Sequence, residues 1–85
     1  MRNPEELKKR LRLLMARDDV NTLTLAKRLG FAEATIRKLL TDPRRPTVST
    51  LQTIAVEFGV SIPWLLGQEP MGDVLEKGNG GTTKS

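Results

Sequence analysis

The chain of 85 residues contains no cysteine and no histidine. Without cysteine it can form no disulfide, no thiolate metal site and no cysteine nucleophile. Without histidine it lacks the side chain that most often serves as a general base and as a zinc ligand. Only carboxylates remain for acid–base chemistry, so we expect a protein that is not an enzyme and that uses no cofactor or metal ion.

Aromatic residues are scarce, and long apolar runs are absent. Phe31, Phe58 and Trp64 are the aromatic residues, so leucine, isoleucine and valine must supply most of the core. No apolar run approaches the roughly 18 residues of a membrane span, and the N-terminus lacks the charged-then-apolar order of a signal peptide. We therefore expect a small cytoplasmic protein of one domain, with no membrane contact.

Positive charge is concentrated in one part of the chain. The formal net charge of +4 by itself favours polyanion binding only weakly. The basic residues of the segment 27–45 are Lys27, Arg28, Arg37, Lys38, Arg44 and Arg45, with only Glu33 and Asp42 as acidic residues among them. No lysine or arginine follows until Lys77. This distribution predicts a domain that is basic at one end.

Apolar periodicity and capping residues predict five helices. Their expected ranges are 3–17, 22–29, 32 or 33 to 40, 48–58 and 62–66. Asn21, Thr47 and Ser61 are the expected N-caps, because their side-chain oxygens can accept hydrogen bonds from free amides of the first turn. Gly30 and Gly59 end the second and fourth helices, because glycine readily takes the left-handed conformation.

The segment from Thr22 to Lys38 has the pattern of two helices joined by a tight turn. Ala26 is small where two helices cross at a steep angle, since a larger side chain would hold them apart. Gly30 allows the chain to reverse in few residues. Ile36 and Leu39 hold the second helix from beneath, so that its other face protrudes. The sequence thus predicts a helix-turn-helix with one protruding face.

These motifs resemble the Cro and phage-repressor type (XRE-type) helix-turn-helix DNA-binding family. The resemblance covers roughly residues 7–67 and rests on LxLAxxLG at 23–30, TIRKLL at 35–40, TLQTIAVEFGVS at 50–61 and WLLG at 64–67. It implies an all-α, lambda repressor-like fold of five helices, with residues 33–40 as the recognition helix. The DNA-binding domain would then comprise residues 1–67, followed by a largely disordered tail at 68–85.

The resemblance also implies which residues contact DNA. Side chains early in a recognition helix read base edges in the major groove, and the residues at these positions are Glu33, Ala34, Thr35, Arg37 and Lys38. Phosphate contacts supply affinity and register rather than sequence information; we expect them from Thr22, Lys27, Arg28, Thr41, Arg44, Arg45 and Thr47. Glu33 is explained equally well as an acidic residue that stabilises the helix dipole.

Two further features bear on these expectations. The chain departs from the family pattern at Thr22, Ala32, Leu40 and Asp42-Pro43, where glutamine, a capping serine or threonine, glutamate and asparagine-glycine are usual. The basic residues of the first helix are Lys8, Lys9, Arg10 and Arg12. We expect them to form a solvated helix face, with a DNA-backbone contact by Arg10 or Arg12 as the alternative.

The function expected from this pattern is sequence-specific transcriptional repression by a homodimer bound to a pseudo-palindromic operator. A single helix-turn-helix makes few base contacts, so a second copy supplies affinity. The expected dimer contacts, after the family, are Ile62, Leu65, Met71 and Val74. Two alternatives stay open: an antitoxin that binds a toxin through the tail from Gln68 and represses its own operon, and a protein-interaction module that has lost DNA binding.

Overall fold

The computed structural model describes residues 4–43 and 46–75. Within these ranges the helices are α1 (Pro4–Asp18), α2 (Thr22–Leu29), α3 (Glu33–Thr41), α4 (Val48–Phe58) and α5 (Ile62–Leu65). Each boundary lies within one residue of the range expected from the sequence, and the all-α class of five helices is confirmed. Among these described helices, none has the length and hydropathy that crossing a membrane requires.

The helix ends form through the capping residues that the sequence indicated. The side-chain oxygens of Asn21, Thr47 and Ser61 each accept a hydrogen bond from the backbone amide three residues further on. Gly30 has a φ of 76°, which a residue with a Cβ atom adopts only with strain. Ala32 precedes α3 and makes no side-chain cap hydrogen bond, which costs that helix about 1 kcal/mol relative to serine or threonine.

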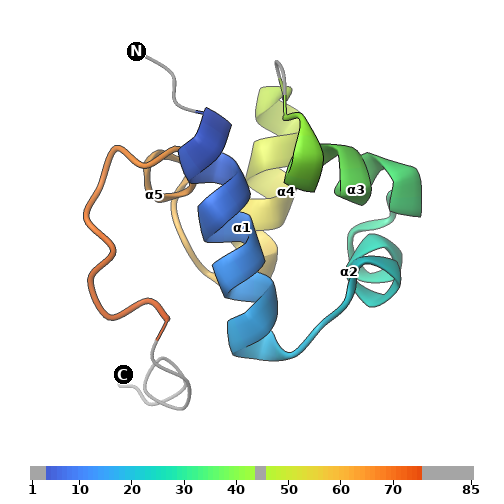
Figure 1. The fold of residues 1–85 in the computed structure, drawn as a ribbon, viewed down its shortest axis with the longest axis horizontal. Helices are drawn as coiled ribbons and strands as arrows, with labels where there is room; N and C mark the ends of the chain where they lie inside the picture. Colours follow the sequence, from blue (N-terminus) through green and yellow to red (C-terminus); the bar gives the residue numbers. More distant parts are fainter. Residues whose placement is uncertain (1–3, 44–45, 76–85) are drawn as a thin grey trace.

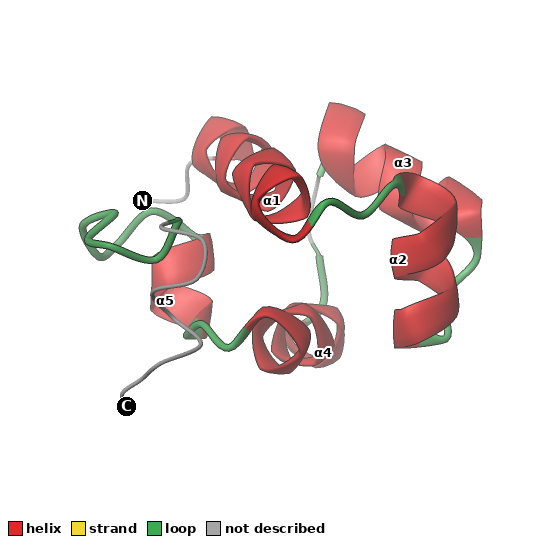
Figure 2. Ribbon diagram, turned by 90° about the horizontal axis from the view of Figure 1, so that it is seen from below, coloured by secondary structure: helices red, strands yellow, loops and turns green. Residues whose placement is uncertain are grey.

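Two helices form the centre of the domain, and the other three lie on either side of them. Figures 1 and 2 show α1 and α4 in the middle, α2 and α3 together on one side, and α5 with the chain after it on the other. The largest fully buried side chains come from all five helices: Leu7, Leu11, Leu14, Leu25, Ile36, Ile54 and Leu65. One continuous apolar core therefore supports the pair formed by α2 and α3.

Residues 66–75, here called the C-terminal segment, pack back against α1 and the core. Met71, Val74 and Leu75 are partly buried against the core cluster. The indole Nε1 of Trp64 donates to the carbonyl of Met71 at 3.2 Å, and Arg17 donates to the carbonyl of Val74 at 2.9 Å. Residues 68–75, which the sequence assigned to a tail, thus pack with the domain, whereas residues 76–85 lie outside the described residues.

Arg10 is buried, so the expectation that it belongs to a solvated face was wrong. It is 7% exposed, and its guanidinium lies 4.7 Å from the centroid of the Trp64 ring. Its Nε donates to Glu6 at 3.1 Å, and its Nη1 donates to the carbonyls of Trp64 at 3.0 Å and Glu69 at 2.7 Å. The C-terminal segment covers this side of α1 and leaves Arg10 no surface for DNA.

Candidate nucleic-acid interface

The turn between α2 and α3 is braced from inside. Leu25 and Ala26 are buried on α2, and Ile36 and Leu39 are buried on α3. The backbone amide of Phe31 donates to the carbonyl of Ala26 at 2.9 Å across the turn. Because the buried residues on the inner side of α3 hold the helix on the domain, the residues on its outer side do not pack against the core.

The outer side of α3 carries Ala34, Thr35, Arg37 and Lys38, all of them exposed. These are four of the five positions that the sequence predicted to read bases. Guanidinium and ammonium groups match the acceptors of guanine, and alanine and threonine methyl groups match the methyl group of thymine. Nowhere in the described residues do three or more carboxylates gather as a metal ion would need. The chemistry of this side suits a base-lined groove.

Glu33, the fifth predicted position, is bonded to both helices of the motif. Its Oε2 accepts a hydrogen bond from the hydroxyl of Thr22 at 2.7 Å and another from Arg37 at 3.2 Å. The hydrogen bond from Thr22 is the main cause of a lowered Glu33 pKa; desolvation opposes it, and the charge and hydrogen bond of Arg37 add to it. The spacing of Glu33 and Arg37 is readable from sequence, whereas the contact with Thr22 depends on how α2 and α3 cross.

We expect Thr22→Val to raise the pKa of Glu33 toward its ordinary value, because valine keeps the shape of threonine but has no hydroxyl to donate. A titration of the Glu33 side-chain carboxyl carbon by NMR measures this pKa. Folding lowers the pKa of Glu33, so the charged carboxylate stabilises the fold at pH values above its unfolded-state pKa. This contribution is lost as the pH falls through the folded-state pKa. An unchanged pKa in Thr22→Val would show that Arg37 alone holds the carboxylate.

The residues predicted to contact phosphates occupy different surroundings. Lys27 and Thr41 are exposed. Arg28 forms an ion pair with Glu57 of α4 at 3.6 Å, and the hydroxyl of Thr47 caps α4. The remaining two, Arg44 and Arg45, lie outside the described residues. Within the described part, Thr22 contacts Glu33 at the start of α3 and Thr41 is the last residue of α3, whereas Lys27 and Arg28 lie on α2.

The residues predicted to form a dimer are only partly accessible. Ile62, Met71 and Val74 are partly buried and pack against the core of their own domain. Leu65 is fully buried at 0% exposure, so its side chain has no surface to offer a second copy.

Comparison with known proteins agrees with this geometry. Residues 10–70 match the family model of the Cro/C1-type HTH DNA-binding domain. A protein of Coxiella burnetii (strain RSA 493 / Nine Mile phase I) described as an uncharacterized HTH-type transcriptional regulator is 36% identical over 66 residues. The match spans 76% of this chain but only 31% of that protein. No solved structure matches the chain. The chain belongs to the Cro/C1-type helix-turn-helix DNA-binding domain family.

Proposed function

We propose that this protein is a sequence-specific transcriptional repressor that binds a pseudo-palindromic operator as a homodimer. The observation that carries the proposal is the exposure of Ala34, Thr35, Arg37 and Lys38 on one side of α3, while Ile36 on the opposite side is 0% exposed. A helix so presented can enter the major groove without rearrangement of the core. The similarity to an HTH-type transcriptional regulator supports a regulatory role.

Within this proposal the residues of the motif divide by task. Lys38 and Arg37 bind guanine, and Ala34 and Thr35 contact thymine methyl groups. Glu33 accepts a hydrogen bond from a cytosine amine through the oxygen that Thr22 and Arg37 do not hold, since both bond to its Oε2. Lys27 and Thr41 bind the flanking phosphates and fix the register.

Two copies of the chain would read one half-site each. Because a single motif contacts few bases, a dimer gains affinity from a second half-site about 34 Å away along the duplex. The half-buried side chains of Ile62, Met71 and Val74 are the proposed contacts between copies. Leu65 takes no part, because it is fully buried.

Selection of binding sites from random duplexes tests the proposal as a whole. The expected product is an enriched palindrome whose half-sites repeat after one turn of the duplex, about 10 base pairs. Enrichment of a single half-site would contradict the dimer but keep the recognition helix. Recovery of no common sequence would contradict sequence-specific repression.

We expect Lys38→Ala to weaken binding to the selected duplex by about 1–3 kcal/mol and to relax the preference at one base position. Lys27→Ala removes the same charge from an exposed position on α2, and should weaken binding to selected and random duplexes alike. Equilibrium titrations of both duplexes with both variants separate the two effects. An equal loss on both duplexes for Lys38→Ala would remove this residue from the base-reading set.

A further inference from the structure

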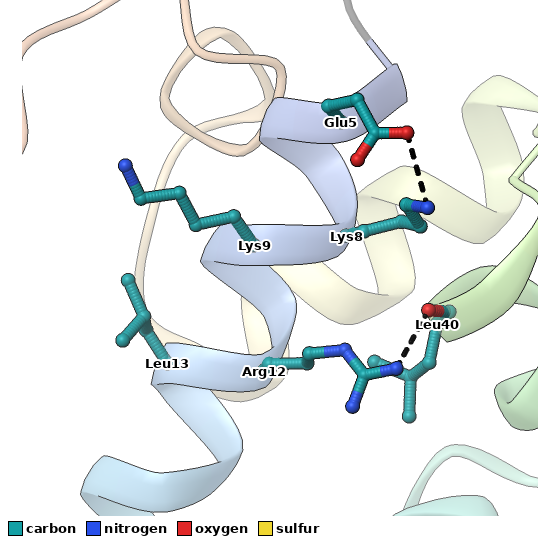
Figure 3. Close-up of a pocket in the computed structure, with 6 residues that line it drawn as sticks. All are labelled: Glu5, Lys8, Lys9, Arg12, Leu13 and Leu40. Carbon is teal, nitrogen blue, oxygen red and sulfur yellow. Dashed lines mark hydrogen bonds and ion pairs between the residues drawn. The ribbon is translucent and has the colours of Figure 1, made fainter.

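A basic groove between α1 and the end of α3 is not used by the contacts proposed so far. Its volume is about 440 Å³, and its lining residues, drawn in Figure 3, are Glu5, Lys8, Lys9, Arg12, Leu13 and Leu40. Three cations and one carboxylate therefore surround a space on the surface of the domain. A small anion is the ligand class that such a lining favours.

Two of these cations are fixed to the C-terminal end of α3. Arg12 Nη2 donates to the carbonyl of Leu40 at 3.0 Å, and Lys8 Nζ donates to the carbonyl of Thr41 at 3.4 Å. Carbonyls of the last helical turn have no partner within the helix, so these bonds hold the two side chains in place. Figure 3 shows Lys8 and Arg12 directed toward α3, whereas Lys9 points to the other side of α1.

Most of the hydrogen-bonding capacity of Arg12 is still available. Its side chain is exposed, and Leu40 is its one hydrogen-bond partner among the described residues. A guanidinium has five N–H donors in a planar fork that matches phosphate oxygens. Glu5 lies 3.1 Å from Lys8 and partly neutralises it, so Arg12 is the stronger donor of the pair.

We propose that Arg12 and Lys8 bind a backbone phosphate of the duplex whose major groove receives α3. This inference rests on the proposed function and extends the footprint to α1. A helix that lies in the major groove leaves it past the sugar-phosphate backbone, and Leu40 and Thr41 form the end that leaves. Side chains anchored on the carbonyls of these residues lie where that backbone passes. The contact adds affinity that does not depend on base sequence.

The test measures duplex affinity as a function of salt concentration for the full chain. Arg12→Gln should lower affinity for the selected and the random duplex by the same factor and reduce the slope of log K against log salt by about 0.9. Lys9→Gln is the matched comparison, because it removes the same charge from a lining residue whose side chain points away from α3 and has no bond to it. Its slope should change by less than half as much.

A second variant covers the risk that Arg12→Gln disturbs the end of α3. Glu5→Gln keeps both cations and removes the carboxylate beside Lys8, so it should tighten binding to both duplexes and steepen the slope. Phosphate binding in the groove is contradicted if the wild type binds the duplex and neither Arg12→Gln nor Glu5→Gln changes the slope. It is also contradicted if Lys9→Gln changes the slope as much as Arg12→Gln does. A wild type that binds no duplex at all would overturn the proposed function and this inference together.

Discussion

Arg10→Ala is expected to lower the free energy of unfolding by about 2–4 kcal/mol, one of the largest effects of any single substitution in the domain. The guanidinium joins α1 to the carbonyls of Trp64 and Glu69 at 3.0 and 2.7 Å. Alanine removes the donor from the Glu69 carbonyl and the cation from the face of the Trp64 ring. The Trp64 carbonyl keeps the hydrogen bond from the backbone amide of Gly67 at 3.1 Å. The C-terminal segment would lose this attachment to α1 and keep the hydrogen bond from Arg17 to the carbonyl of Val74.

Urea denaturation followed by far-UV circular dichroism measures this loss. The fluorescence of Trp64, the only tryptophan, reports separately on the attachment of the C-terminal segment. Lys9→Ala is the control, because Lys9 is exposed on the same helix and its replacement should cost less than about 0.5 kcal/mol. A similarly small cost for Arg10→Ala would mean that water satisfies the Glu69 carbonyl and that the buried arginine contributes little.

Ile36→Ala is expected to cost about 2–5 kcal/mol of stability, because it opens a cavity beneath α3. Ile36 is fully buried in the core cluster, and its side chain holds the recognition helix onto the domain. We also expect Ile36→Ala to lower the affinity for DNA, because an α3 that packs loosely against the core must become ordered when it enters the major groove.

Thermal unfolding gives the stability loss, and a titration of the selected duplex at a temperature where the variant is folded gives the loss in affinity. Leu23→Ala is the matched comparison, because Leu23 lies in the same motif but is 49% exposed; it should cost far less stability. Full affinity in folded Ile36→Ala would show that the position of α3 does not depend on the core beneath it.

The helix boundaries could be predicted because the forces that set them are local. Asn21, Thr47 and Ser61 each bond within their own first turn, and Gly30 supplies the positive φ that ends α2. Short-range signals of this kind are present in the sequence whatever surrounds them. The core side of each helix followed from apolar spacing for the same reason.

Contacts between distant residues could not be predicted in this way. Arg10 is separated from Glu69 by 59 positions, and it looked like one more member of a basic helix face. Its burial depends on the return of the C-terminal segment, whose sequence of glycine, proline and acidic residues gives no periodic signal. The bond between Thr22 and Glu33 escaped prediction because it depends on the crossing of two helices.

For the candidate site, the sequence predicted which side of α3 is exposed but not which partners its residues have in the folded domain. The exposed side of α3 follows from the spacing of Ile36 and Leu39, which fixes the buried side. The pairing of Arg28 with Glu57 and the anchoring of Arg12 on Leu40 follow only from the packing of α4 and α1 against the motif. The sequence motif specifies which side of α3 faces outward. Tertiary packing decides which of the basic side chains around α3 are free to bind phosphate.

The central claim is that the outer side of α3 enters the duplex, and backbone amide chemical shifts followed by NMR during titration with the selected duplex test it most directly. The account predicts the largest shift changes at Thr22 and across residues 33–38, with smaller changes at the proposed dimer contacts Ile62, Met71 and Val74. Shift changes concentrated in α5 and the C-terminal segment, with residues 33–38 unaffected, would contradict it.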